Sequence, residues 1–260
     1  MKRLVIAIVG LALASTATAA SLTEKIDRTF DVKPGAGIAV SNVNGRISVA
    51  SWDQAKVRVV ATKEVEGAKQ DLKELMAALK VELVPRDGGL TITTRHPKHE
   101  HGIASIFDAL SGNNINYEVT YEITVPRNMN VAIENTNGTV SLSNVTGVLA
   151  LETTNGRIAV ANCAGTVSAS TTNGSIEAQL VRMEKKAMHF ETTNGRISVS
   201  LPKSAAVDLD ASTTNGSIES SLPVTTRSMG KNTLRGSING GGTPLTIRTT
   251  NGGITLKTAI

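Results

Sequence analysis

The chain has 260 residues, of which 40% are hydrophobic and 19% charged, a composition typical of a globular protein with an apolar core rather than of a disordered chain. Aromatic residues make up only 2%, which argues against a surface that stacks on nucleic-acid bases. Lys and Arg number 27 against 22 Asp and Glu, and they are dispersed apart from Lys185-Lys186, so a basic nucleic-acid-binding patch is not indicated.

The first twenty residues, 1–20, have the pattern of a signal peptide. Lys2 and Arg3 form a positively charged start, and residues 4–14 form an apolar run. Small residues then lead up to Ala20 and supply a cleavage site. The apolar run is shorter than the roughly 20 residues of a membrane-spanning helix, so we expect cleavage rather than a transmembrane anchor. The expected location is the periplasm, the cell surface or the extracellular space.

Residues 21–136 are expected to form a unit of strands that is continuous with the tract after it. Alternating apolar residues predict strands over 30–40 and 46–60, the second with a bend at Ser51-Trp52-Asp53. Residues 95–116 are polar and contain three His and two Gly, so we expect a loop insertion there.

One helix is predicted in this N-terminal part, over residues 68–80. Its apolar residues recur at helical spacing: Leu72, Leu75, Met76 and Leu79. The end of a stack of strands exposes unpaired backbone groups, and we expect the helix to cover such an end or edge.

A repeat dominates the rest of the chain, residues 137–260. The tetrapeptide Thr-Thr-Asn-Gly occurs five times between residues 153 and 252, and shorter relatives include Asn44-Gly45, Asn137-Gly138 and Asn239-Gly240. Successive pairs in this tract lie 12 to 24 residues apart, mostly close to 20. A sustained period of that length is typical of a solenoid, in which each repeat buries its apolar face against its neighbours.

Each repeat contains two short strands. After Gly138, Thr-Val-Ser-Leu alternates polar and apolar residues, and a second alternating stretch follows the turn at Gly147. An Asn-Gly pair between strands commonly marks a hairpin, but its regular recurrence favours a corner repeated on every coil over a plain meander. The predicted fold class is all-β: a β-solenoid of short stacked strands with Thr-Thr-Asn-Gly corners and one inserted helix near the N-terminal end.

Stacked corners predict a structural ladder. Asn amides on successive coils can hydrogen-bond to one another and to turn backbone. Gly accepts the positive φ of a corner, and β-branched Thr suits the adjoining strand end. The predicted ladder consists of Asn137, Asn155, Asn173, Asn194, Asn215 and Asn251 with Gly138, Gly156, Gly174, Gly195, Gly216 and Gly252.

A family resemblance follows from these segments. Tyr-Glu-Ile-Thr-Val-Pro at 121–126, then Val-Ala-Ile-Glu-Asn-Thr-Asn-Gly at 131–138 and the serial Thr-Thr-Asn-Gly units resemble the bacterial family of β-strand-repeat domains called "putative adhesins". The resemblance covers about residues 28–260, and the family is similar to the head domains of autotransporter adhesins. It implies a β-solenoid with an adhesin-like role, and it carries no catalytic residues over to this chain.

Two sets of side chains are candidates for chemistry. His96, His99 and His101 lie within six residues and could bind Zn or Cu, but no second ligand cluster accompanies them, so a solvated loop without a cofactor is favoured. Asp208 and Asp210 share one strand face, as paired catalytic carboxylates require. Apolar residues alternate with them, which is the pattern of an ordinary outward polar face.

The sequence therefore predicts an exported, non-enzymatic β-solenoid with an adhesin-like, binding or scaffold role at the cell envelope. The expected partner is a protein or glycan of the envelope or of the extracellular space, and not nucleic acid. The open edges of a solenoid also allow self-association. The alternative is a carbohydrate-active β-helix enzyme, a polysaccharide lyase or hydrolase, whose motifs have diverged.

Overall fold

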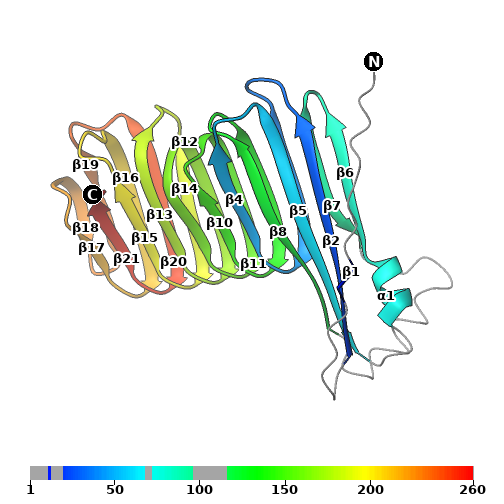
Figure 1. Cartoon of the computed structure of the whole chain (residues 1–260). Helices are drawn as coiled ribbons and strands as arrows, with labels where there is room; N and C mark the ends of the chain where they lie inside the picture. The colour runs from blue at the N-terminus through cyan, green and yellow to red at the C-terminus, as the bar shows by residue number, and fades with distance from the viewer. Residues whose placement is uncertain (1–10, 13–19, 68–71, 96–115, 260) are drawn as a thin grey trace.

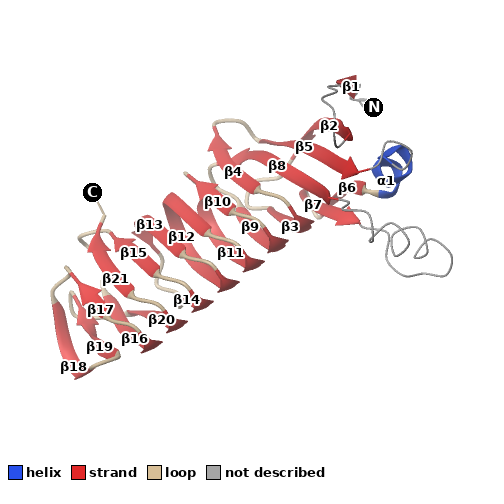
Figure 2. Ribbon diagram, turned by 90° about the horizontal axis from the view of Figure 1, so that it is seen from below, coloured by secondary structure: helices blue, strands red, loops and turns tan. Residues whose placement is uncertain are grey.

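The computed structural model describes residues 11–12, 20–67, 72–95 and 116–259 (Figure 1). These residues form 21 strands and one helix, and all the strands join one hydrogen-bonded network. The strands stack side by side into an elongated coil, which Figure 2 shows from below. Neighbouring coils pair in parallel, as in a solenoid and unlike a meander. The predicted all-β solenoid is confirmed.

Each regular coil contributes one strand to each of two layers, with an Asn-Gly corner between them. Layer 1 contains, in stacking order, β6 (Lys80–Arg86), β7 (Gly89–Arg95), β3 (Gly37–Asn44), β9 (Asn130–Asn137), β11 (Thr146–Asn155), the second half of β12 (Ile158–Asn173), β14 (Met188–Asn194), β20 (Thr243–Asn251), β16 (Val207–Asn215), β19 (Thr233–Ile238) and β18 (Val224–Gly230). Layer 2 contains β1 (Leu11–Ala12), β2 (Ala20–Asp31), β5 (Lys56–Gly67), β8 (Asn116–Pro126), β4 (Ile47–Trp52), β10 (Val140–Ser143), the first half of β12, β13 (Ile176–Met183), β15 (Ile197–Leu201), β21 (Ile254–Thr258) and β17 (Ile218–Ser220).

The inward side chains of the two layers form one continuous core. Along β9, for example, Val131 and Ile133 are buried, whereas Glu134 is exposed. Tyr121 and Phe190 are the aromatic side chains that are fully buried among the described residues. The remaining core is mostly Val, Ile, Leu and Ala, and such side chains fill the thin space between two layers of strands.

The coils do not stack in chain order at either end. β3 and β4 lie between the strands β7 and β8 on one side and β9 and β10 on the other. Likewise, β20 and β21 lie between β14 and β15 on one side and β16 and β17 on the other. The expectation that corners stack on successive coils of the chain is therefore wrong at these two places. The inserted coils have hydrogen-bonded neighbours on both sides.

Antiparallel elements close the ends of the stack. In layer 1, β6 pairs with β7 at one end and β18 with β19 at the other. Layer 2 is extended by the antiparallel ribbon of β8, β5 and β2. The helix α1 (Leu72–Ala78) contacts β2 and β5 and buries Leu72, Leu75 and Met76. Within the described residues, no helix has the length and apolar character needed to span a bilayer.

Several local predictions are corrected or fall outside the described residues. The strand predicted over 30–40 is wrong, because β2 ends at Asp31 and a turn with Gly35 at φ 74° precedes β3. Within 46–60, the bend predicted at 51–53 lies at residues 53–55, where it separates β4 from β5. The helix ends at Ala78 rather than at 80, because Lys80 already begins β6, and residues 68–71 at its predicted start lie outside the described residues. Most of the predicted leader and residues 96–115, with His96, His99 and His101, also lie outside the described residues.

Candidate functional site

The repeated Asn side chains form one row along the corner edge of the solenoid. Six of these amides donate a hydrogen bond of 2.7–2.8 Å to the side-chain oxygen of the Asn on a neighbouring coil, and Asn44 at the end of the row only accepts one. In stacking order the row contains Asn44, Asn137, Asn155, Asn173, Asn194, Asn251 and Asn215. The structure thus brings together the six Asn residues named from the repeats and adds Asn44. Asn239 lies elsewhere, where it donates to the backbone oxygens of Lys203 and Ala205.

A second set of hydrogen bonds lies just inside this row. The first Thr of each repeat is buried, and in four coils its hydroxyl donates to the carbonyl oxygen of a corner Gly on the adjacent coil, over 2.9–3.1 Å. The donors are Thr171, Thr192, Thr249 and Thr213, and the acceptors are Gly156, Gly174, Gly195 and Gly252, respectively. Asn135 replaces Thr in the coil of β9, and its amide donates to Gly45 over 3.1 Å. Corners are therefore held to the next coil by two sets of side-chain hydrogen bonds, the exposed Asn–Asn bonds and the buried Thr–Gly bonds.

The corner glycines approach one another too closely for any side chain. A Cβ on Gly174 would overlap the carbonyl oxygen of Gly156, and one on Gly195 would overlap that of Gly174. The φ angle is positive at Gly138 and Gly252. It lies outside the left-handed region at the other four ladder positions, Gly156, Gly174, Gly195 and Gly216. The expectation that a positive φ selects Gly at the corner is therefore wrong at those four positions, where the close approach of coils is the reason.

The second Thr of each repeat faces solvent beside the Asn row. These exposed residues are Thr154, Thr172, Thr193, Thr250 and Thr214. We call the seven Asn and these five Thr residues the corner row. Because adjacent strands lie about 4.8 Å apart, the corner row presents an amide at each such step, and five of its seven coils add an exposed hydroxyl. A surface of this kind can form repeated hydrogen bonds with an extended polar ligand.

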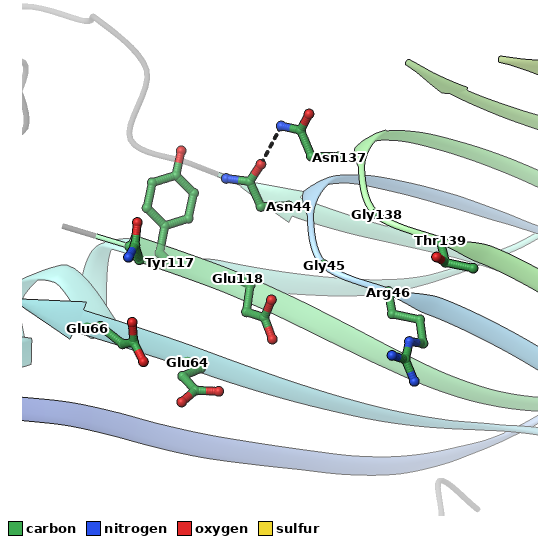
Figure 3. Close-up of a pocket in the computed structure, with 11 residues that line it drawn as sticks. Asn44, Gly45, Arg46, Glu64, Glu66, Tyr117, Glu118, Asn137, Gly138 and Thr139 are labelled. Atoms are coloured by element: carbon green, nitrogen blue, oxygen red, sulfur yellow. Dashed lines mark hydrogen bonds between the residues drawn. The ribbon is translucent and has the colours of Figure 1, made fainter. Parts of the chain in front are cut away.

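The N-terminal end of the corner row opens into a hollow of about 820 Å³ (Figure 3). Asn44, Gly45, Asn137 and Gly138 line one wall, and the dashed line in Figure 3 marks the hydrogen bond between the two Asn side chains. The other walls come from the ribbon of β5 and β8, which runs past the corner. They contain Glu64, Glu66, Asn116, Tyr117 and Glu118, whereas Arg46 and Thr139 line the hollow from the corner side, directly after Gly45 and Gly138.

The hollow carries excess negative charge. Glu64 of β5 lies directly opposite Glu118 of β8 in the antiparallel register, and Glu66 lies opposite Asn116. Among the described residues that line the hollow, Arg46 is the one cation. Like charges directly opposite each other on a sheet are destabilising. The hollow therefore suits a ligand that brings hydroxyl or cationic groups to these carboxylates.

The hollow is the part of the site that reading of the sequence missed. The alternation Lys63-Glu64-Val65-Glu66 does indicate a strand with one acidic face. Its partner strand, however, begins at Asn116, beyond residues 96–115. Only the pairing of β5 with β8 sets Glu64 opposite Glu118.

The other candidates named from the sequence lie apart from this site. Asp208 is paired with Arg227 and Asp210 with Arg235, at 3.3 and 3.0 Å. Asp208 also accepts a hydrogen bond from the backbone of Gly242. In the part of the chain that the structure describes, no group of three His, Cys, Asp or Glu side chains is placed to hold a metal ion.

The fold and the corner row define an all-β solenoid with stacked Asn-Gly corners. Residues 36–257 match the model of the Toastrack DUF4097 family, and the chain belongs to that family. The family resemblance inferred from the sequence is thereby confirmed. No protein of curated function matches the chain.

Several solved structures match most of this chain at low identity and low TM-score. A "putative cell adhesion protein" from Clostridium sporogenes has 13% identity and a TM-score of 0.43 over 89% of this chain and 98% of its own. A "putative adhesin" from Bacteroides fragilis has 9% identity and a TM-score of 0.37 over 89% and 96%. Another from Parabacteroides merdae has 10% identity and a TM-score of 0.23 over 89% and 95%.

Proposed function

We propose that this chain is an exported, non-catalytic binding protein of the bacterial cell envelope, and that the corner row and its adjoining hollow bind an extended, hydroxyl-rich polymer such as a glycan. The corner row is the main observation in support of this proposal. Exposed amides and hydroxyls recur in register on consecutive coils, whereas a site for one small molecule needs only a single convergent set. An extended protein segment is the other class of partner that could hydrogen-bond along the corner row.

Export is supported by the leader pattern and by where the folded strands begin. Cleavage after Ala19 or Ala20 removes β1 and leaves β2 intact from Ser21, because β2 starts at Ala20. Protease treatment of intact cells, compared with cells whose outer membrane has been opened, tests the location. Digestion of the chain on intact cells supports surface display and an adhesive role. Protection until the outer membrane is opened places the binding role in the periplasm.

The binding site is tested with a triple variant of the corner row, Thr154→Ala, Thr172→Ala and Thr193→Ala. These side chains are exposed, so their removal costs little stability. The matched control is Ser198→Ala, Ser200→Ala and Thr255→Ala, which removes three hydroxyls from the outer face of layer 2. On an array of envelope and host glycans, we expect the triple variant to lose about ten-fold or more in affinity and the control to bind normally. Equal binding by all three proteins contradicts the proposed site.

One observation favours the enzyme as a second candidate. Glu64 and Glu118 lie directly opposite each other on paired strands, with Cβ atoms about 5 Å apart. Side chains so placed can bring their carboxyl groups to the roughly 5–5.5 Å separation of a retaining glycosidase. The test is release of reducing sugar from the glycan that the chain binds, with Glu64→Gln and Glu118→Gln as variants. We expect no release from the wild-type protein. Turnover that both variants abolish would replace the binding role by a hydrolytic one.

A further inference from the structure

The strand β2 carries the longest open edge among the described strands. On one side it pairs with β5 along all 12 of its residues. On the other side it pairs only with β1, where Leu11 lies opposite Glu24 and Ala12 opposite Thr23. Removal of the leader takes β1 away, and no other described strand then pairs with this edge from Ser21 to Asp31. Figure 2 shows β2 at the end of the stack.

The other edges of the solenoid are less suited to pairing with another chain. β17 has only three residues. β18 has an irregular register between Thr226 and Ser228, and β6 contains Pro85. Short edges, bulges and proline are the usual devices that block edge-to-edge association. β2 has 12 residues, no proline and an unbroken register with β5. Its charged side chains, which are a further device against edge pairing, are complementary between two copies in the register proposed below.

We propose that two copies of the processed chain associate through antiparallel pairing of β2 with β2, about a two-fold axis that passes between the two Ile26 residues. The sequence Ser-Leu-Thr-Glu-Lys-Ile-Asp-Arg-Thr-Phe-Asp from 21 to 31 is chemically self-complementary in this register. Such an isologous contact joins the two layer-2 sheets into one and satisfies the open backbone groups of both edges. The inference rests on the leader removal contained in the proposed function and is independent of the glycan partner.

The apolar side chains of β2 match across this axis. Leu22, Ile26 and Phe30 lie on its inner face and are only partly buried against the core. In the proposed register, Leu22 lies opposite Phe30 of the partner subunit, and the two Ile26 residues face each other. Aromatic and branched side chains placed directly opposite each other stabilise paired strands, and here they also gain burial.

The charges match as well. Lys25 lies opposite Asp27 of the partner subunit, and Glu24 lies opposite Arg28 of the partner subunit. Within one chain, Asp27 is paired with Arg58 at 2.6 Å, and Glu24 with Lys63 at 2.7 Å. The Nη1 atom of Arg28 is buried and has no hydrogen-bond partner within the described residues. The proposed register gives this guanidinium the carboxylate that it lacks.

The association is tested on the exported chain, whose N-terminus is first established by mass spectrometry. That step separates failure of leader removal from failure of the pairing. Sedimentation velocity over a range of concentrations should give twice the chain mass for the wild type. Lys25→Glu places like charges opposite each other at two symmetric positions and should weaken the dimer about ten-fold or more. The control Lys231→Glu changes an exposed residue outside β2 and should leave the dimer unchanged.

The register is tested by cysteine crosslinking with two nearly isosteric variants, Thr23→Cys and Thr29→Cys. In the proposed register, residue 23 lies opposite residue 29 of the partner subunit, at a Cα separation of about 5.5 Å that a disulfide can bridge. Each variant alone should stay uncrosslinked, and an equimolar mixture should form a disulfide-linked pair under mild oxidation. The native Cys163 is buried and does not interfere. A monomer at all concentrations, or crosslinking of either variant alone, would overturn the proposal.

Discussion

Asn251 donates a side-chain hydrogen bond to Asn194 over 2.7 Å, although 57 residues separate the two in the chain. Asn215, the next Thr-Thr-Asn-Gly residue after Asn194 in the sequence, bonds to Asn251 instead. The coil that ends the chain is therefore an interior coil of the stack. Residues 216–242, which precede it in the sequence, form the outer end.

This arrangement predicts the order of hydrogen exchange. We expect the amides of β20 to exchange as slowly as those of β14, because β20 has hydrogen-bonded strands on both sides. Amides of β18, which pairs with β19 alone, should exchange faster although they lie further from the C-terminus. Hydrogen–deuterium exchange with peptide-level mass spectrometry measures both segments in one sample. Faster exchange in β20 than in β18 contradicts the inserted coil.

We expect Asn194→Ala to lower the unfolding free energy more than Asn215→Ala does. Asn194 donates to Asn173 and accepts from Asn251, so its removal breaks two hydrogen bonds. Asn215 ends the row and donates one. At about 0.5–1.5 kcal/mol for each bond, the loss in unfolding free energy should be about 1–3 kcal/mol for Asn194→Ala and about half that for Asn215→Ala. Urea denaturation measures both values, and equal costs would contradict a ladder of paired amides.

Gly174→Ala should be strongly destabilising, because its Cβ would overlap the carbonyl oxygen of Gly156. The coils would have to separate at a point held by buried hydrogen bonds, and we expect a loss of about 3 kcal/mol or more, or failure to fold. Gly253→Ala is the matched control, since its Cβ would meet Ser217 only at an ordinary contact distance of 3.4 Å. That variant should be neutral or slightly stabilising. Thermal denaturation distinguishes the two, and a tolerated Gly174→Ala would refute the close approach.

Tyr121 should make the chain sensitive to alkaline pH. Burial raises the pKa of its hydroxyl to about 12, although the hydrogen bond with Thr94 lowers the pKa in part. The unfolded chain releases this proton near pH 10, so stability is lost as the pH rises from about 10 to 12, by up to about 2.7 kcal/mol. Tyr121→Phe removes this dependence and costs about 1 kcal/mol at pH 7. Urea unfolding at pH 8 and pH 11.5 should therefore show the variant as the less stable protein at pH 8 and the more stable one at pH 11.5. Parallel losses in both proteins would contradict a buried, protonated Tyr121.

The sequence by itself determined the local architecture. Alternation with period two marks which residues of each strand face the core, as Val131 and Ile133 illustrate. The Thr-Thr-Asn-Gly repeat predicts the corner chemistry, because an amide beside a Gly at a strand end has few other hydrogen-bond partners than the same amide on the next coil. In the same way, the helical spacing of the apolar residues from Leu72 to Leu79 predicts that they are buried, as they are in the structure.

Only the tertiary structure decided the order of the coils. Near-identical corners such as those at Asn194, Asn215 and Asn251 can pair with one another in any order, so their local sequence carries no information about which of them are neighbours. The order follows from long-range backbone pairing and from the space that the connecting segments allow. The same pairing creates the hollow where Glu64 meets Glu118 and leaves β2 with an open edge. Hydrogen bonds between strands distant in sequence decide these features, and no local pattern can encode them.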